Sequence, residues 1–281
     1  MNISLTGAEG NFGTEFRRLS VGQNDVHVIP VGRSDWSNID EKLASADVVV
    51  HAACDLRTPA SVAPSRLLES NVMTTATLLE ASRRKRVKRL VFISSCAVYG
   101  EDMRTSEDSL CCPISINGIS KHLNEKLIAE FCSANDMQYQ ILRVFNSYGG
   151  DDRFSIFSKL KLALQTRTPF TLNNDGRMQR DFIHVKDVAS VVLDLITAGT
   201  THTHLNIGTG VATKISTLVD MVAAQFPQLA VQRGLTQEAE YSRADNTRLR
   251  EVWTGEFTRV EDYIRADFAA YAANDLLGTV R

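Results

Sequence analysis

Several features that define other classes of protein are scarce or missing in this sequence of 281 residues. No apolar run approaches the roughly 18–20 residues that a membrane span requires, so no membrane partner is expected. Neither sign of charge dominates, because 31 Lys and Arg residues stand against 33 Asp and Glu residues and leave a net charge of −2. A balanced charge gives no overall attraction to nucleic acid. The first residues lack the basic and long apolar segments of a signal peptide, and we therefore expect a cytoplasmic protein.

Cysteine is also scarce, and its spacing argues against two uses. The five cysteines include no C-x-x-C pair, which speaks against a disulfide framework and against zinc ligation, and indicates a reducing compartment. His202 and His204 form an H-T-H segment, but no third ligand is suggested near them. We interpret them as the polar end of a strand and expect no metal site.

Short apolar runs alternate with helical patterns over the first 150 residues. Strands are predicted at 3–5, 26–31, 47–51, 90–94 and 140–144, and helices at 14–19, 72–81 and 121–132. Apolar strands separated by helices are typical of a parallel sheet that is covered on both faces. The sequence therefore predicts an α/β fold with a Rossmann-like, doubly wound parallel sheet.

The pattern loosens after residue 149. Helices are predicted at 159–164, 187–196, 215–225 and 260–277, a strand at 204–207, and a polar turn region at 169–181. We expect residues 1–148 to form a dinucleotide-binding domain, with 182–198 packing back on it. Residues 149–281 would then form mainly a smaller, interleaved substrate-binding domain.

Glycines recur at every third position where the first strand meets the first helix. Gly7 would permit the tight turn, Gly10 the approach of a pyrophosphate to the backbone, and Gly13 the close packing of helix on strand. The free N–H groups of the helix N-terminus would face the anion. We expect this turn, including Asn11 and Phe12, to bind a dinucleotide.

The end of the second strand indicates which dinucleotide is bound. An acidic residue there binds the ribose 2′-hydroxyl of NAD, whereas an arginine accepts the 2′-phosphate of NADP. Residues 31–35 read V-G-R-S-D, which places Arg33 and no acid at the strand end. NADP is therefore favoured over NAD. In the alternative interpretation Arg33 is solvated and Asp35 binds the ribose.

The spacing of the three glycines resembles the turn of short-chain dehydrogenases/reductases. Beyond it, the chain resembles the NAD-dependent epimerase/dehydratase family, the extended members of that group, which act mostly on nucleotide-diphosphate sugars. The segments that carry the resemblance are V-V-H-A-A at 49–53, N-V at 71–72, F-I-S-S-C-A-V-Y-G at 92–100, L-R-V-F-N-S-Y-G at 142–149, R-D-F-I-H-V-K-D-V-A at 180–189 and N-I-G-T-G at 206–210. Their conjunction in this order is specific to the family.

The resemblance implies roles for residues at the cofactor. Ala52 and Ala53 would pass under the dinucleotide at a strand end, and Lys121 would bind the nicotinamide ribose. Ser95 would stand in the place of the catalytic hydroxyl, which bonds the sugar oxygen whose proton moves.

The resemblance also implies a substrate site and a partner. Asn146 and Arg180 would contact the nucleotide diphosphate, and a fixed cation opposite a diphosphate is physically sensible. Arg243 and Asp245 lie where the family places further nucleotide contacts. Relatives often pair through two helices each, so a homodimer is expected.

The segment that should hold the catalytic tyrosine departs from the family. The family pattern is P-x-x-x-Y-G-x-S-K, and residues 113–121 read P-I-S-I-N-G-I-S-K, so Asn117 stands in the place of the tyrosine. The resemblance implies that Lys121 lowers the pKa of that tyrosine, which then acts as general base. An asparagine amide forms hydrogen bonds but does not titrate, and the loss of a general base costs about 10²–10⁴ in rate.

Three interpretations of Asn117 stay open. The chain is an altered form of an ordinary enzyme, or the natural enzyme uses another acid or base, or the protein binds nucleotides without turnover. For the second interpretation Cys96 is the nearest candidate, because some relatives carry a working cysteine in the same turn. His122 follows Lys121 and is expected to point away from it on the helix.

A second departure narrows the chemistry. Family 4,6-dehydratases carry an Asp-Glu pair just before V-Y-G, and here these places hold Cys96 and Ala97. Dehydration is therefore less expected than epimerisation or ketone reduction. The predicted function is NAD(P)-dependent 4-epimerisation or 4-keto reduction of a nucleotide sugar, and the alternative is a catalytically silent nucleotide-binding protein.

Overall fold

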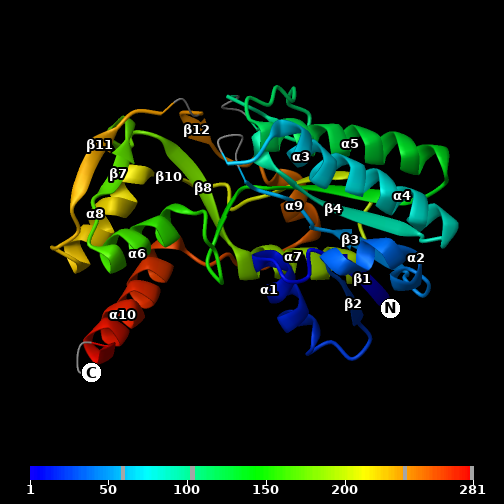
Figure 1. The fold of residues 1–281 in the computed structure, drawn as a ribbon, viewed down its shortest axis with the longest axis horizontal. Coiled ribbons are helices and arrows are strands. Elements are labelled where there is room, and N and C mark those ends of the chain that lie inside the picture. The colour runs from blue at the N-terminus through cyan, green and yellow to red at the C-terminus, as the bar shows by residue number, and fades with distance from the viewer. Residues whose placement is uncertain (58–60, 102–104, 237–238, 279–281) are drawn as a thin grey trace.

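The computed structural model describes residues 1–57, 61–101, 105–236 and 239–278 (Figure 1). Its larger sheet has six strands in the order β2-β1-β3-β4-β5-β9, and neighbouring strands run parallel. The strands are β1 (Asn2–Thr6), β2 (His27–Val31), β3 (Val48–His51), β4 (Arg89–Ser95), β5 (Gln138–Val144) and β9 (His204–Ile207). The predicted α/β fold with a Rossmann-like parallel sheet is confirmed.

Helices cover both faces of this sheet. Figure 1 shows α1 and α7 along one face and α3, α4 and α5 along the other. The bounds are α1 (Asn11–Ser20), α2 (Ile39–Lys42), α3 (Pro64–Leu68), α4 (Thr74–Arg84), α5 (Ile116–Ala134), α7 (Val185–Ala198) and α9 (Thr247–Val252). Shorter turns lie between them, namely η1 (Arg33–Asn38), a π-helical turn η2 (Glu69–Met73) and η3 (Cys96–Val98).

The alternation of side chains along the strands explains the apolar runs. In β3, Val48 and Val50 belong to the hydrophobic cluster under α1 and α7, whereas Val49 belongs to the cluster under α4 and α5. Ile3 and Leu5 of β1 are completely buried in the first of these clusters. A strand that is buried on both faces needs apolar residues at successive positions.

A smaller unit has its own core, built around Tyr148, Phe157 and Phe182. Its helices are α6 (Ile156–Thr166), α8 (Ile215–Gln225) and α10 (Val260–Gly278). Its strands are β6 (Asn146–Tyr148), β7 (Phe170–Asn173), β8 (Gln179–His184), β10 (Ala212–Lys214), β11 (Val231–Gly234) and β12 (Tyr241–Ser242), with the turn η4 (Asn174–Gly176). β8 pairs with β10, β12 and β6, and β7 pairs with β11.

The prediction of a polar turn region at 169–181 was wrong. β7 and the start of β8 occupy most of it, and the turn is confined to η4. β7 is paired in parallel with β11, a strand that lies about sixty residues further along the chain, so its polar side chains face solvent on a paired strand. The local sequence shows only the polarity and not the pairing.

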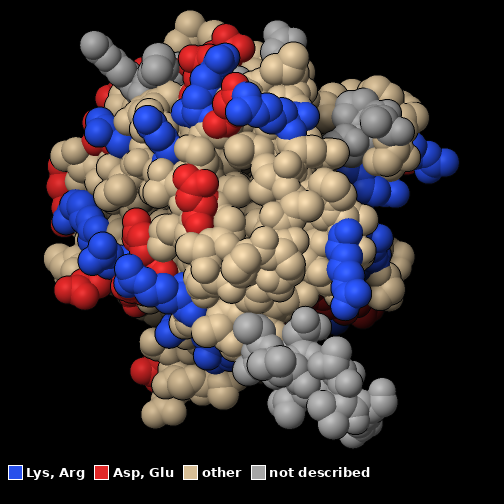
Figure 2. Space-filling model, turned by 90° about the vertical axis from the view of Figure 1, so that its left-hand side faces the viewer, with Lys and Arg blue, Asp and Glu red and all other residues tan. Residues whose placement is uncertain are grey.

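The chain passes repeatedly between the two units. After β8 it forms α7, which packs against α1 through Val188 and Val192, then enters the large sheet as β9 and leaves it again as β10. α7 and α1 therefore share one hydrophobic cluster with the large sheet. The smaller unit's outer face carries both basic and acidic side chains around a largely uncharged centre (Figure 2). None of the helices in the described ranges is both long and apolar enough to cross a bilayer.

Candidate functional site

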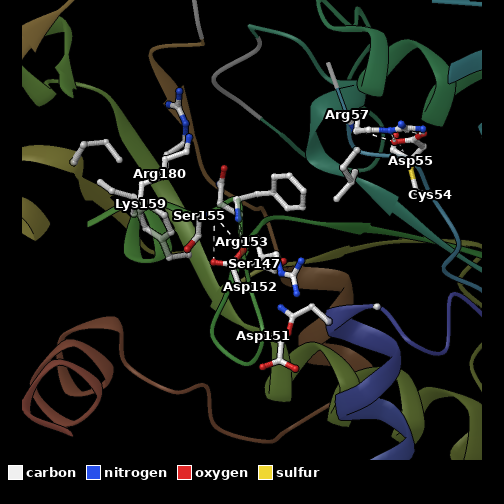
Figure 3. Close-up of a pocket in the computed structure, with 18 of the residues that line it drawn as sticks. Cys54, Asp55, Arg57, Ser147, Asp151, Asp152, Arg153, Ser155, Lys159 and Arg180 are labelled. Carbon is white, nitrogen blue, oxygen red and sulfur yellow. Dashed lines mark hydrogen bonds and ion pairs between the residues drawn. The ribbon is translucent and has the colours of Figure 1, made fainter. Parts of the chain in front are cut away.

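A cavity of about 840 Å³ opens beyond the carboxyl ends of β1 and β3. These strands meet where the order of the sheet reverses, since β2 lies on one side of β1 and β3 on the other. Ligands of doubly wound sheets bind in the crevice at such a switch point. Figure 3 shows side chains from both units around this cavity, with Cys54, Asp55 and Arg57 on one side and Lys159 and Arg180 on the other.

The glycine turn forms one wall of the cavity through Gly10 and Asn11. Gly7 has a φ of +70°, and a Cβ there would lie 2.8 Å from the Ala53 nitrogen. A Cβ on Gly13 would lie 2.3 Å from the Gly7 carbonyl oxygen. The turn is therefore packed backbone against backbone, which only glycine allows at these two positions.

Asn11 connects this turn to the segment after β6. Its Nδ2 donates to the Gly149 carbonyl at 2.9 Å, while its Oδ1 is buried and has no partner in the described structure. A buried amide oxygen without a donor is costly unless a ligand supplies one. Phe12 lies elsewhere, since it packs on the core beside Phe16 at 5.7 Å between ring centroids and does not line the cavity.

A chain of hydrogen bonds fixes the end of β3 under the turn. The Thr6 hydroxyl accepts from the Ala52 and Ala53 N–H groups at 3.2 and 3.1 Å and contacts His51 Nδ1 at 2.7 Å. His51 Nε2 lies 2.9 Å from the Thr75 hydroxyl, which itself donates to the Asn71 carbonyl. Thr75 must therefore accept from Nε2–H, and Nδ1 must accept from Thr6, which makes His51 a neutral Nε2–H tautomer.

Burial supports the same protonation state. His51 is completely buried, and its removal from solvent, with a smaller contribution from the Lys121 charge, lowers its pKa to about 3. A buried histidine with no acidic partner disfavours the charged form. His51 therefore serves as a fixed neutral link at neutral pH.

Asn71 ties the end of β3 to the helix that follows β4. Its Oδ1 accepts from the Asp55 N–H at 2.7 Å, and its Nδ2 donates to the Asp55 carbonyl at 3.1 Å. Asn124 of α5 donates to the Asn71 carbonyl at 2.9 Å. The N-V motif at 71–72 thus has a positioning function that the sequence did not reveal.

Cationic side chains surround the cavity. The members are Arg33, Arg57, Arg153, Lys159 and Arg180. Sequence reasoning singled out Arg33 and Arg180 and missed the other three. Arg57 and Arg153 lie in the loops after β3 and β6 and Lys159 lies in α6, and none of these segments carries a motif.

Two of these cations differ in how they are held. Arg57 is paired with Asp55 at 2.5 Å, and this pairing holds the pKa of Asp55 below its usual range. Arg33 forms no hydrogen bond or ion pair with the described residues. Asp35 is already engaged, because its carboxylate accepts from the Gly32 N–H at 2.7 Å and lies 3.3 Å from Lys42 Nζ.

The three residues that were expected to bind the nucleotide, Asn146, Arg180 and Arg243, line two different cavities. Asn146 and Arg180 line the large one; Asn146 Nδ2 donates to the Asp181 carbonyl at 2.9 Å, and an Arg180 guanidinium nitrogen donates to the Gln179 carbonyl at 3.0 Å. Arg243 instead lines a separate cavity of about 610 Å³ together with Asp245. Arg243 therefore does not line the cavity that Asn146 and Arg180 share, because the backbone beside it is bonded to Asp181 and Thr105 at the second cavity.

The residues expected at the reaction centre lie where the N-terminus of α5 packs on the turn after β4, and none of Ser95, Asn117 and Lys121 is among the residues that line the large cavity. Ser95 Oγ accepts from the Ala97 N–H at 3.2 Å, and Asn117 is the second residue of α5. A Cβ on Gly118 would lie 2.3 Å from the Ala97 carbonyl, so the helix is packed closely on the turn after β4. Lys121 is buried, and its Nζ donates to the Ile93 carbonyl at 2.6 Å.

Cys96 and Cys54 occupy different surroundings. Cys96 Sγ contacts the Ser242 hydroxyl at 4.0 Å, does not line the large cavity, and has a pKa raised to about 11 by removal from solvent. This placement weighs against Cys96 as a substitute base. Cys54 lines the cavity, and its Sγ lies 3.8 Å from Asn117 Oδ1. Sequence reasoning missed Cys54; its position directly after the V-V-H-A-A strand end was the available signal.

His122 faces away from the cavity, toward Cys111 and Glu125. These three side chains could approach one ion, since their ligand atoms lie within 4.8 Å of one another. The Glu125 carboxylate, however, already accepts from Arg143 at 2.8 Å and from Ser94 at 2.5 Å. His202 contacts Glu251 at 2.9 Å. We assign a structural role to these contacts.

Comparison with known proteins gives a consistent result. The model of the NAD dependent epimerase/dehydratase family matches residues 5–208. A putative UDP-glucose 4-epimerase of Methanocaldococcus jannaschii is 33% identical over 198 residues, which are 66% of this chain and 63% of the relative. The UDP-glucose 4-epimerase of Rhizobium leguminosarum bv. trifolii is 28% identical over 213 residues, 67% of this chain and 65% of the relative. The chain thus spans less than two thirds of the length of these curated relatives.

Solved structures resemble the chain over nearly its whole length. MoeE5 in complex with UDP-glucose and NAD is 26% identical with a TM-score of 0.86, and covers 98% of this chain and 100% of its own. MoeE5 in complex with UDP-glucuronic acid and NAD is 28% identical with a TM-score of 0.85, over 94% and 97%.

Proposed function

Because the chain belongs to the NAD-dependent epimerase/dehydratase family, we propose that it performs NAD(P)-dependent redox chemistry on a nucleotide-diphosphate sugar. The reaction would be 4-epimerisation or reduction of a 4-ketone. One observation carries the proposal: a single cavity has the glycine turn on one wall and Asn146 and Arg180 on another. The relatives named as UDP-glucose 4-epimerases, and the MoeE5 complexes with UDP-sugars and NAD, support this class of substrate.

The residues present fit a nicotinamide dinucleotide. Gly10 faces the cavity at the N-terminus of α1, and Asn11 Oδ1 is a buried acceptor without a donor. The backbone N–H groups of the turn would hold the pyrophosphate, Ala52 and Ala53 would underlie it, and Lys121 would face the nicotinamide ribose. The bound dinucleotide would accept and return a hydride.

Arg33 supports a preference for NADP. It lines the cavity and forms no hydrogen bond or ion pair with the described residues, whereas Asp35 is turned back on Gly32 and Lys42. An unpaired guanidinium suits a 2′-phosphate, and an engaged carboxylate is a poor acceptor for a 2′-hydroxyl. The solved relatives were observed with NAD, so both dinucleotides belong in the binding test below.

The protein groups would divide the work on the sugar nucleotide. Arg180 and Asn146 would hold the diphosphate, with Lys159 on the same side of the cavity (Figure 3). The Ser95 hydroxyl would bond the reacting sugar oxygen. We further propose that residues 1–148 with 182–198 form the dinucleotide domain, that 149–281 form mainly the substrate domain, and that two copies pair through exposed apolar positions on α5 such as Ile119 and Leu123.

A second candidate function follows from Asn117. Because an amide cannot exchange the proton at the reacting oxygen, the protein would bind the same ligands without turnover. The Asn117 side chain at the N-terminus of α5 is the observation that favours this candidate.

Two measurements separate the candidates. Calorimetry with NAD, NADH, NADP and NADPH tests dinucleotide binding, and absence of heat with all four contradicts both. Turnover of a panel of UDP- and dTDP-sugars is then compared between the wild type and Asn117→Tyr. Turnover by the wild type supports the enzyme, and turnover only by Asn117→Tyr supports the silent candidate. No turnover by either protein contradicts the substrate class.

A further inference from the structure

The thiol of Cys54 stands beside Asn117, the second residue of helix α5. Cys54 Sγ lies 3.8 Å from Asn117 Oδ1, and Cys54 lines the cavity. The two residues are 63 positions apart in the chain. β3 ends at His51, so the thiol lies three residues beyond the carboxyl end of the strand at the switch point of the sheet.

One residue, Asn71, fixes both sides of this contact, through its side chain on one side and its backbone carbonyl on the other. Asn71 bonds both the N–H and the carbonyl of Asp55, the residue next to Cys54. Asn124, about two helical turns beyond Asn117 on α5, donates to the Asn71 carbonyl. The segment after β3, which carries the Cys54 thiol, and helix α5, which carries the Asn117 amide, are therefore held in a fixed position relative to each other.

We propose that Cys54 exchanges the proton that the missing tyrosine would exchange, and that Asn117 positions its thiol. This inference rests on the proposed function and names a catalytic residue for it. In the oxidative half-reaction the Cys54 thiol would first release its proton to solvent, and the thiolate would then take the proton of the sugar hydroxyl. The C–H bond at the same carbon would break, its electron pair would leave as hydride for the oxidised nicotinamide ring, and a carbonyl would form. In the return step the thiol gives its proton back to that oxygen as hydride returns to carbon.

An asparagine suits both states of the thiol. Its Oδ1 is one of two acceptors within reach of the Cys54 S–H group, at 3.8 Å, and the other is the Asp55 carbonyl at 3.9 Å. After rotation of the amide, its Nδ2 would donate to a thiolate, so Asn117 would orient sulfur in either state without exchanging a proton itself.

The neighbouring titratable groups are committed elsewhere. Asp55 is paired with Arg57, and Lys121 Nζ is bonded to the Ile93 carbonyl. Cys96 contacts Ser242 and is not among the residues that line the cavity. A thiol can exchange a proton whereas the amide at the tyrosine position cannot, which leaves Cys54 as the group in contact with that position.

The first test measures where the thiol lies, and needs no turnover. Carbamidomethylation of Cys54 and of Cys112 by iodoacetamide is followed by mass spectrometry, with and without NAD or NADP. At ten times Kd the dinucleotide should slow modification of Cys54 about tenfold. The exposed Cys112 is the matched control and should react at the same rate throughout. A dinucleotide that binds by calorimetry but leaves Cys54 equally reactive overturns the inference and leaves the proposed function standing.

The second test measures the chemistry with the sugar nucleotide that the wild type turns over best. Cys54→Ala should lower kcat about 10²–10⁴-fold with the dinucleotide Kd nearly unchanged, which is the cost of a lost acid/base. Cys112→Ala should keep the wild-type rate. A Cys54→Ala variant that retains kcat, or a large loss found in Cys96→Ala instead, contradicts the role of Cys54. The role of Cys54 is also contradicted if the wild type binds dinucleotide without turning over any sugar while Asn117→Tyr is active. If neither protein turns over any sugar, the proposed function itself has failed.

Discussion

The two ends of the candidate site are built from different kinds of group. At the glycine turn, backbone meets backbone: Gly7 and Gly13 leave no room for a Cβ, and His51 is held neutral between two hydroxyls. At the N-terminus of α5, side chains carry the geometry, with Asn117 in contact with Cys54. No other residue can replace glycine where one backbone segment packs directly on another, because a Cβ would collide. A proton, in contrast, can be exchanged by any titratable side chain that reaches the reacting oxygen. We therefore expect substitutions in the glycine turn to disrupt the site, whereas at the N-terminus of α5 the role of exchanging the proton can pass from one side chain to another.

The largest expected effect is a gain at the side-chain end. In a Cys54→Ala background, Asn117→Tyr should raise the rate of hydride transfer about 10²–10⁴-fold, because it restores a titratable hydroxyl one helical turn before Lys121. The dinucleotide Kd should change little. Absorbance of the reduced nicotinamide under single-turnover conditions measures the rate.

Val21→Tyr in the same background is the control for that gain. Val21 lies at the end of α1 and is 87% exposed, so a tyrosine there adds the same group far from Asn117 in the chain and outside the cavity lining. An equal gain from both variants would show that the position of the hydroxyl is unimportant, and would break the contrast between the two ends.

The neutral histidine at the glycine end predicts a pH dependence of stability. The folded-state pKa of His51 is lowered to about 3, below that of an unfolded histidine, so the unfolded chain takes up the proton first. The contribution of neutral His51 to the free energy of unfolding is complete above about pH 6.5. As the pH falls below this value, the contribution is lost at about 1.4 kcal/mol per pH unit. The difference in the free energy of unfolding between the wild type and His51→Gln, measured by urea denaturation from pH 8 to 4, should shrink with this slope as the pH falls. Parallel curves would mean that His51 is charged in the folded state.

The backbone packing of the turn predicts a loss of stability and of binding. Gly13→Ala places a Cβ 2.3 Å from the Gly7 carbonyl, so the backbone must shift, at a cost of about 1–3 kcal/mol. Gly22→Ala is the matched control, because its Cβ would be 3.9 Å from the nearest heavy atom. Urea denaturation and NAD(P) calorimetry should separate the two variants, and equal behaviour would refute tight packing of the turn.

Sequence reasoning was reliable for the large sheet for a physical reason. Its strands are buried on both faces, so successive apolar residues such as those of β3 are visible locally. β7 was missed because its polar side chains resemble a turn and its partner β11 lies far along the chain. Half-exposed strands in small sheets lack the local pattern that marks a buried strand.

Within the site, too, features that depend on neighbouring residues in the chain could be predicted, and features that depend on distant residues could not. The glycine turn could be predicted because its seven residues, Gly7 to Gly13, act on one another. The resemblance located Asn117 as a departure, but the neighbour that gives the departure meaning is Cys54, which only folding brings beside it. The placement of Arg243 in the second cavity likewise depends on the path of the chain past β8 and not on its own segment.

The smallest expected effect concerns dinucleotide choice at the edge of the glycine end. Arg33 has no protein partner in the described structure and lines the cavity, so Arg33→Ala should weaken NADPH about tenfold, or about 1.4 kcal/mol, through loss of one charge-assisted contact. NADH binding should change less than twofold, since no 2′-phosphate is present. Arg33→Lys keeps the charge and should recover part of the NADPH affinity. Calorimetric Kd values for both dinucleotides measure the ratio, and an equal loss for NADH and NADPH would place Arg33 on the pyrophosphate and return the choice of cofactor to Asp35.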